Sequence, residues 1–306
     1  MPCRGNFVIL QTKTQRDMDE KDMKDMKEVR GAEFGGERAL FGVKNVRLVD
    51  CVFHSGESAL KHSADIVAEH CRFEGRYPFW HTENFRIDDC EFTVDSRAPL
   101  WYSDHLVMRR THIDAPKMFR EMRDLYLEDV KIPEAVETFW HCHGVKLRNV
   151  EIAKADNVFK DCTDIDIDGY RHQGKYAFQY CKDIVIRNAV LDTKDAFWET
   201  ENVTIYDSEI NGEYLGWHSR NLHLIRCRIN GTQPLCYAEG LVLEDCEMGP
   251  QCDLAFEESE VEATVTSSIV SVKNPTTGHI RALAIGEVII DKNVSAPADC
   301  VIETEL

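Results

Sequence analysis

Side chains that can transfer a proton or hold a ligand recur in this sequence once every 19 to 21 residues. Three consecutive members, Glu121, His141 and Asp161, combine two carboxylates with an imidazole. If each interval is one coil of stacked parallel strands, neighbouring members lie about 4.8 Å apart and the two carboxylates about 9.6 Å apart. That separation is close to the roughly 6.5–9.5 Å of inverting glycosidases, in which one carboxyl group is the general acid and the other the general base. We therefore predict Glu121 and Asp161 as acid and base, with His141 adjusting their pKa values.

Two other roles fit the same residues. His141 and His143 could join a carboxylate and bind a metal ion, because imidazole and carboxylate are common metal ligands. Alternatively, a column of alternating acids and bases avoids like-charge contacts between stacked strands and has no chemical role. The prediction assigns no cofactor and no metal ligand.

The tryptophans form a second column, directly before the first one in the sequence. Its five members are Trp80, Trp101, Trp140, Trp198 and Trp217. Arg120 and Lys160 occupy the same position in other repeats, and the position before it is apolar nearly throughout. Lysine and arginine are almost never fully buried unless paired. We therefore predict that the apolar column points into the core and that the tryptophan column points outward.

Exposed tryptophans that alternate with cations suit a saccharide, whose ring stacks on an indole while polar side chains bond its hydroxyl groups. We predict that this face binds a neutral or weakly charged saccharide or glycoconjugate, with Trp101 and Trp140 as stacking platforms. The residues assigned to this binding face are Trp80, His81, Trp101, Tyr102, Arg120, Trp140, Lys160, Tyr180, Trp198, Trp217 and His218. Two alternatives stay open. A loop or terminal segment covers the tryptophans, or the strip is a non-enzymatic protein interface or homodimer contact, since exposed aromatic and arginine side chains are frequent hot spots.

Short strands are the elements that position these columns. Each repeat opens with a residue that is mostly Asn, Asp or Gly and continues with apolar residues at alternate positions, as in Asn45 to Phe53. Alternation predicts strands, and Asn, Asp or Gly suits a bend at positive φ. A leucine-rich repeat of this length would show one alternating stretch, whereas each unit of this chain shows two. We predict an all-β chain that forms a single-stranded right-handed parallel β-helix of about eleven coils.

The repeat covers residues 27–259. Residues 1–26 carry no repeat, and we predict a flexible extension or a loose N-terminal cap. Residues 260–306 are predicted to form irregular strands that close the coil, because an open β edge promotes aggregation.

Composition excludes several classes of partner. The formal charge of −18 disfavours nucleic acid, anionic membrane surfaces and polyanionic glycans, so we predict neither a nucleic-acid nor a membrane partner. The sequence contains no long apolar run and no signal-peptide core, which predicts a cytoplasmic protein. Most of the twelve cysteines follow the repeat spacing and none forms a Cys-x-x-Cys motif, so they predict a reduced packing ladder.

From about Met26 onward, the sequence resembles an uncharacterised bacterial family of single-stranded right-handed β-helix proteins. The segments that carry the resemblance are Phe34 to Phe41, Phe79-Trp80-His81, Phe139-Trp140-His141 and Ile285 to Asp291. The resemblance implies this fold and no established reaction. Some members are labelled hydrogenase, but such metal centres need clustered cysteine ligands, and the cysteines of this chain are spread one per repeat. More distantly, the chain is similar to pectin-lyase-like β-helix enzymes, which implies a carbohydrate ligand.

Overall fold

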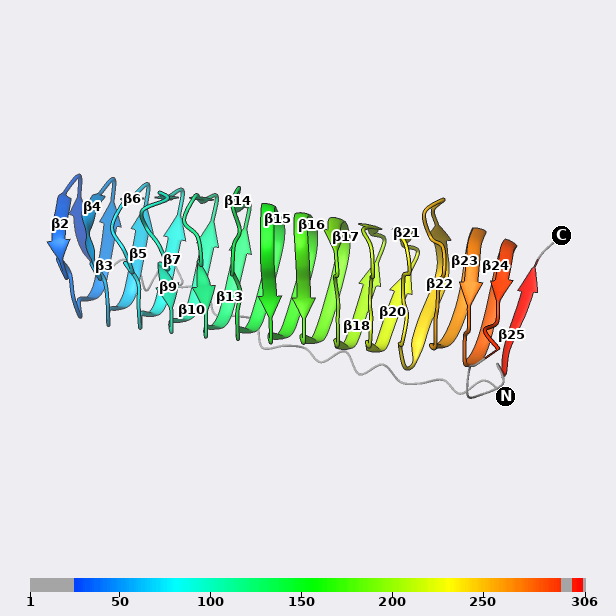
Figure 1. Cartoon of the computed structure of the whole chain (residues 1–306). Coiled ribbons are helices and arrows are strands. Elements are labelled where there is room, and N and C mark those ends of the chain that lie inside the picture. The colour runs from blue at the N-terminus through cyan, green and yellow to red at the C-terminus, as the bar shows by residue number, and fades with distance from the viewer. Residues whose placement is uncertain (1–24, 293–298, 305–306) are drawn as a thin grey trace.

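The computed structural model describes residues 25–292 and 299–304, and every regular element in these ranges is a β-strand. The strands stack coil upon coil into one elongated solenoid (Figure 1). Each coil pairs in parallel with the next, beginning with Lys27 opposite Val46. The predicted all-β right-handed parallel β-helix is confirmed.

One continuous ladder forms the first side of the solenoid. Its strands are β1 (Lys27–Arg30), β3 (Lys44–Val49), β5 (Ala64–Glu69), β7 (Glu83–Asp88), β10 (Asp104–Arg109), β13 (Arg123–Glu128), β15 (His143–Lys160), β16 (Thr163–Gln179), β17 (Lys182–Lys194), β18 (Glu201–Tyr206), β20 (Arg220–Ile225), β22 (Leu241–Met248), β23 (Glu260–Lys273), β24 (Thr277–Ile289) and β25 (Asp299–Thr304).

Shorter strands form the other two sides. The second side contains β2 (Glu33–Glu37), β4 (Val52–Glu57), β6 (Arg72–Phe73), β8 (Glu91–Phe92), β11 (His112–Ile113), β14 (Lys131–Ile132), β19 (Glu209–Asn211) and β21 (Arg228–Asn230). The third side contains β9 (Leu100–Trp101) and β12 (Phe119–Arg120). The long strands β15 and β16 continue around all three sides, so their second halves belong to these shorter ladders.

The solenoid has about fourteen turns, so the predicted number of about eleven is too low. The difference lies mainly at the C-terminal end, where β23, β24 and β25 extend the first ladder in parallel, with register shifts between Leu243 and Cys246 and between Val265 and Ser268. Residues beyond Ser259 lack the polar corner residue of the repeat but keep inward apolar residues such as Val261 and Val265. Apolar alternation is therefore sufficient to continue the coil. Of the predicted N-terminal extension 1–26, residues 1–24 lie outside the described residues.

The first residue of each repeat adopts the left-handed conformation that its type suggests. This set has φ values from 52° to 72° and consists of Asn45, Asp65, Asn84, His105, Asp124, Gly144, Asp164, Asp183, Asn202, Asn221 and Gly240. Side chains of neighbouring members form hydrogen bonds with each other. For example, Asn202 Nδ2 donates a hydrogen bond to Asp183 Oδ1 over 2.9 Å. The predicted bend at positive φ is confirmed, and it turns the chain from the third side into the first.

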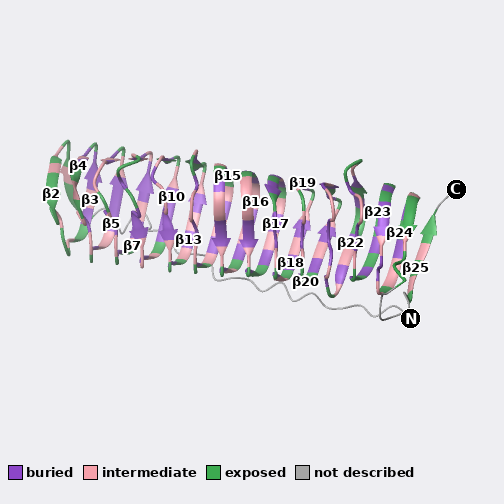
Figure 2. Cartoon of the chain, in the orientation of Figure 1, coloured by how far each residue is buried: buried purple, intermediate pink, exposed green. Residues whose placement is uncertain are grey.

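Figure 2 shows buried residues recurring in the strands of successive coils. The hydrophobic ones among them form a single core cluster along the axis. Phe119, Phe139, Phe159, Phe178 and Phe197 form a continuous stack with ring centroids 4.5 to 4.8 Å apart. Such stacks of identical residues are possible because the same repeat position recurs in neighbouring coils. They fix the positions of the outward residues that flank them in sequence.

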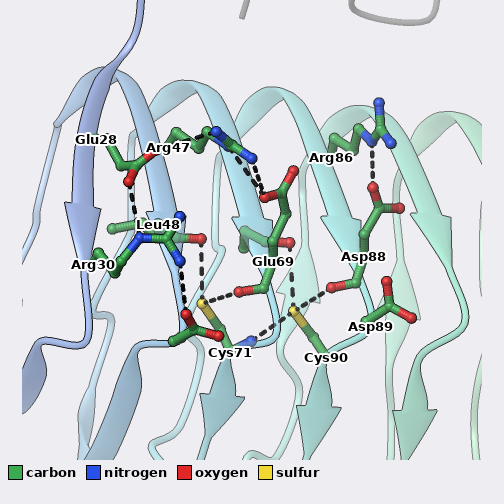
Figure 3. Close-up of polar contacts among 12 residues, drawn as sticks. Glu28, Arg30, Arg47, Leu48, Glu69, Cys71, Arg86, Asp88, Asp89 and Cys90 are labelled. Atoms are coloured by element: carbon green, nitrogen blue, oxygen red, sulfur yellow. Dashed lines mark hydrogen bonds and ion pairs between the residues drawn. The ribbon is translucent and has the colours of Figure 1, made fainter.

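Cysteines and ion pairs form two further ladders near the N-terminal end (Figure 3). All the described cysteines are free, and only Cys300 is not buried, so the predicted reduced ladder agrees with the structure. The thiol of Cys71 donates to Leu48 O and Glu69 O over 3.5 and 3.3 Å. On the outer face, Arg47 pairs with Glu69 at 2.6 Å. Partly exposed pairs of this kind contribute about 0–1 kcal/mol each, so the buried core is the main source of rigidity.

Candidate functional site

The apolar and tryptophan columns point in opposite directions, as predicted. The apolar column is fully buried and comprises Leu60, Phe79, Leu100, Phe119, Phe139, Phe159, Phe178 and Phe197. The tryptophans and the interleaved cations are half-buried at the surface of the third side. We call this surface the aromatic–basic face and define it as Lys61, Trp80, Trp101, Arg120, Trp140, Lys160, Trp198 and Trp217.

Every indole of the aromatic–basic face is held by the same hydrogen bond. The indole N–H donates to a backbone carbonyl of the next coil over 2.6 to 3.0 Å, and the acceptors are Ala98, Lys117, Asn157, Tyr214 and Gln233. All five acceptor residues have positive φ. The indole thus satisfies a corner carbonyl that the strand ladder leaves available. This bond fixes the plane of each tryptophan and gives it a structural role as well.

The rings and cations of the aromatic–basic face stack along the solenoid axis. Trp80 and Trp101 are stacked with centroids 5.5 Å apart. The guanidinium carbon of Arg120 lies 4.3 Å from the Trp101 ring and 4.5 Å from the Trp140 ring, and Lys160 Nζ lies 5.4 Å from the Trp140 ring. Both faces of Trp101 and Trp140 are therefore occupied. Trp101 and Trp140, the two predicted stacking platforms, therefore offer a ligand the edges of their rings and not the faces.

The proton-transferring column lies beside the tryptophans and forms a corner of each coil. We call it the acid–base column, and its members have φ values from 51° to 59°: His62, His81, Tyr102, Glu121, His141, Asp161, Tyr180, Glu199, His218 and Tyr237. Its rings also stack, with His62 and His81 4.9 Å apart and His81 and Tyr102 5.2 Å apart. Burial, followed by the charges of His62 and Lys61, lowers the pKa of His81, which favours its neutral form.

The three predicted catalytic residues lie in line on consecutive coils. Parallel bridges join Arg120 to Trp140 and Trp140 to Lys160, which places Glu121, His141 and Asp161 at matching corners. His141 Nδ1 lies 3.9 Å from Asp161 Oδ2, and these side chains are 50% and 42% exposed. Glu121 is exposed as well. The structure thus brings the three together at an open, solvated edge.

Two grooves of the described residues lie on other parts of the molecule. One of about 650 Å³ runs over Asp207, Arg226 and Asp245, and another of about 770 Å³ over Asn211, Gly212 and Gly231. Neither is lined by a residue of the aromatic–basic face or the acid–base column. Sequence reasoning did not identify these grooves. The recurrence of glycine at positions 212 and 231 is the signal that could have indicated the second one.

The structure gives no support to a metal site at His141 and His143. His143 Nδ1 pairs with Asp164 Oδ2 at 3.0 Å and with the Thr163 hydroxyl at 2.5 Å. Within residues 25–292 and 299–304, no three His, Cys, Asp or Glu side chains are grouped as metal ligands. In the same ranges, no helix is long and apolar enough to cross a membrane.

The fold and this surface define a class of protein, the single-stranded parallel β-solenoid with an ordered aromatic–basic face. Within that class, residues 27–303 match the family described as Protein of unknown function (DUF3737), and the chain belongs to this family. No curated protein matches the sequence.

Several solved β-helix structures are similar in shape. The A-module of a mannuronan C-5 epimerase from Azotobacter vinelandii is 11% identical, with a TM-score of 0.44 and 92% of each chain covered. A tailspike protein of an E. coli bacteriophage, in complex with a hexasaccharide, is 10% identical, with a TM-score of 0.49, and the match covers 90% of this chain and 72% of the tailspike. At such identities the similarity concerns the path of the chain and not its activity.

Proposed function

We propose that the protein binds a saccharide or glycoconjugate along the aromatic–basic face. The observation that carries the proposal is the fixed orientation of the five indoles, each tied by its N–H to a corner carbonyl. A surface that is ordered before binding loses little conformational entropy when a ligand arrives. Rigid indoles that stay half-exposed offer apolar ring edges next to polar groups, a combination that suits the C–H and O–H groups of a sugar.

Polar groups for the hydroxyls recur beside every indole. Arg120 and Lys160 are donors within the face, and the acid–base column adds donors and acceptors at the inter-strand spacing of about 4.8 Å. Trp198 stacks on Trp217 on one side, and Gln179 occupies the equivalent position on its other side. Among the described contacts, that second face of Trp198 meets neither an aromatic ring nor a cation. Because Gln179 lies on that side only one coil away, a ligand meets the edge of Trp198, as it does at Trp101 and Trp140.

Hydrolysis is a further step of the same proposal. Glu121 and Asp161 flank Trp140, so a saccharide on the aromatic–basic face passes both carboxylates. Their solvated position supports binding more directly than catalysis, because general acids are usually buried enough to keep a raised pKa. We also propose a cytoplasmic location, which the free thiols of the described cysteines support.

A protein interface is the second candidate, and the position of the grooves favours it. Small-molecule sites are usually concave, whereas the two grooves described above lie away from the aromatic–basic face. Tryptophan and arginine are enriched among interface hot spots. In this version, a second copy of the chain covers the tryptophans.

A glycan array with matched variants tests the proposal. Trp140→Ala removes the ring between Arg120 and Lys160, and Tyr206→Ala is the control, because Tyr206 is an aromatic residue on the first side with Arg187 5.7 Å from its ring. We expect at least one saccharide to bind wild type and Tyr206→Ala with equal affinity and to lose affinity for Trp140→Ala. Equal binding by all three proteins would place the ligand elsewhere and refute the proposal.

A further inference from the structure

The cations of the aromatic–basic face are poorly paired although acidic residues are in excess. The chain has 54 Asp and Glu against 36 Lys and Arg. Arg120 is 19% exposed, and its one ion pair among the described residues joins its guanidinium to Glu137 Oε2 at 3.5 Å. Its Nε is buried without a hydrogen-bond partner. A guanidinium has five N–H donors, so most of those on Arg120 have no partner among the residues that the structure describes.

The neighbours of Arg120 add positive charge. Lys117 Nζ lies 2.6 Å from the same Glu137 oxygen, so one carboxylate serves two cations. Lys160 contacts the rings of Trp140 and Tyr180, and no carboxylate within the described ranges forms an ion pair with it. Arg120 and Lys160 are therefore two under-paired cations, one coil above and one coil below Trp140.

We infer that the ligand of this face carries one oxyanion group, a carboxylate or a phosphate, which lies between Arg120 and Lys160 over the edge of Trp140. The inference rests on the proposed saccharide function and specifies the class of its ligand. A planar guanidinium matches the geometry of both groups and binds either through two hydrogen bonds. The Trp101 and Trp140 rings hold the guanidinium in place before binding.

The surrounding charges select one anionic group and not several. Glu121 and Asp161 lie next to the two cations in sequence and are exposed at the neighbouring corners. These two carboxylates repel a second anionic group beside the cations. The net charge of −18 repels a polyanion. A saccharide with a single acidic group meets the cations without crowding the carboxylates.

Matched sugars and matched variants test this inference. The probes are glucose, galactose, mannose and N-acetylglucosamine, each compared with its 6-phosphate and its uronate in titrations followed by tryptophan fluorescence. We expect an acidic member to bind wild type about tenfold or more tightly than its neutral parent, because hydrogen bonds to charged groups are the stronger ones. The preferred acidic form distinguishes phosphate from carboxylate.

The variants Arg120→Gln and Lys160→Gln each remove one cation, and Lys131→Gln is the control. Lys131 lies on the second side and pairs with Glu151 at 3.7 Å, so the control makes the same charge change away from the face. Loss of the acidic preference in Lys160→Gln and Arg120→Gln, with the preference retained in Lys131→Gln, supports the inference. Lys160→Gln keeps the test valid if Arg120→Gln fails to fold. Equal affinity for acidic and neutral sugars overturns the inference and leaves the saccharide function standing, whereas no binding to any probe overturns both.

Discussion

Acid should destabilise the solenoid through one buried histidine. His172 is 2% exposed, its Nδ1 lies 2.9 Å from the Tyr170 hydroxyl, and its Nε2 is buried without a partner. Burial lowers the pKa of His172 from 6.5 to about 4 and raises the pKa of the Tyr170 hydroxyl, so the hydrogen bond joins a neutral imidazole to a neutral hydroxyl. A histidine whose pKa falls on folding stabilises the fold above the unfolded-state pKa. That contribution is lost as the pH falls from 6.5 towards 4.

The size of the loss follows from the two pKa values. Each pKa unit corresponds to about 1.4 kcal/mol, so His172 lowers the free energy of unfolding by about 2 kcal/mol at pH 5 and about 3 kcal/mol at pH 4. The double variant His172→Leu, Tyr170→Phe removes both polar groups. Leucine fits because Ile152 and Leu191 hold the same position in the adjacent coils.

Urea denaturation at pH 7, 5 and 4, followed by circular dichroism, measures this effect. Other carboxylates titrate over the same range, so the relevant quantity is the difference between wild type and the double variant. We expect wild type to lose about 2 kcal/mol more than the variant between pH 7 and pH 5. Identical pH dependence of the two proteins would refute the reasoning and show that the imidazole does not titrate as a buried group.

Three other predictions concern the aromatic–basic face and the corners. Trp198→Phe removes the indole N–H bond to its carbonyl and leaves a smaller ring to stack on Trp217, and it should lower the free energy of unfolding by about 1 kcal/mol or somewhat more in urea denaturation. Trp140→Phe should cost more, because two cations also contact that ring. Equal costs would argue against the cation contacts. Gly231→Ala places a Cβ 2.0 Å from a backbone oxygen, at a residue whose φ is 143°, and should lower the free energy of unfolding by about 2–4 kcal/mol in the same assay. Gly35→Ala, whose Cβ meets its nearest atom at 3.9 Å, should leave the free energy of unfolding nearly unchanged. Similar losses for both variants would contradict the steric argument. Glu121→Gln should leave the melting temperature unchanged and abolish turnover of any saccharide substrate, and unchanged turnover would exclude it as the acid or base.

The fold could be predicted because the position of a residue within the repeat determines whether its side chain points into the core or out to the surface. Alternating apolar residues such as Leu48 and Phe53 recur at one interval, and only stacking of coils buries them together. Asn45 and its equivalents at the corners follow from their tolerance of positive φ. The number of turns was underestimated because Val261 and Val265 continue the inward columns without a polar corner residue as a marker.

The site could be predicted only in part. Outward placement of the tryptophans followed from Arg120 and Lys160 in the same column. The indole bonds to corner carbonyls could not be predicted, because they depend on the χ angles of side chains and on corners a full coil away in sequence. For the same reason the sequence could not show that ring planes lie across the axis, with Arg120 between two of them. His172 was missed because a single polar residue in an apolar column carries no periodic signal.

The central claim is that the aromatic–basic face binds a saccharide rather than a second copy of the chain. Light scattering and tryptophan fluorescence on the same samples of wild type and Trp140→Ala test it most directly, with each sugar of the panel added in turn. We predict a saturable fluorescence change in wild type, its loss in Trp140→Ala, and an unchanged particle mass in both proteins. A wild-type dimer that no sugar affects and that dissociates in Trp140→Ala would contradict the claim and identify the face as a protein interface.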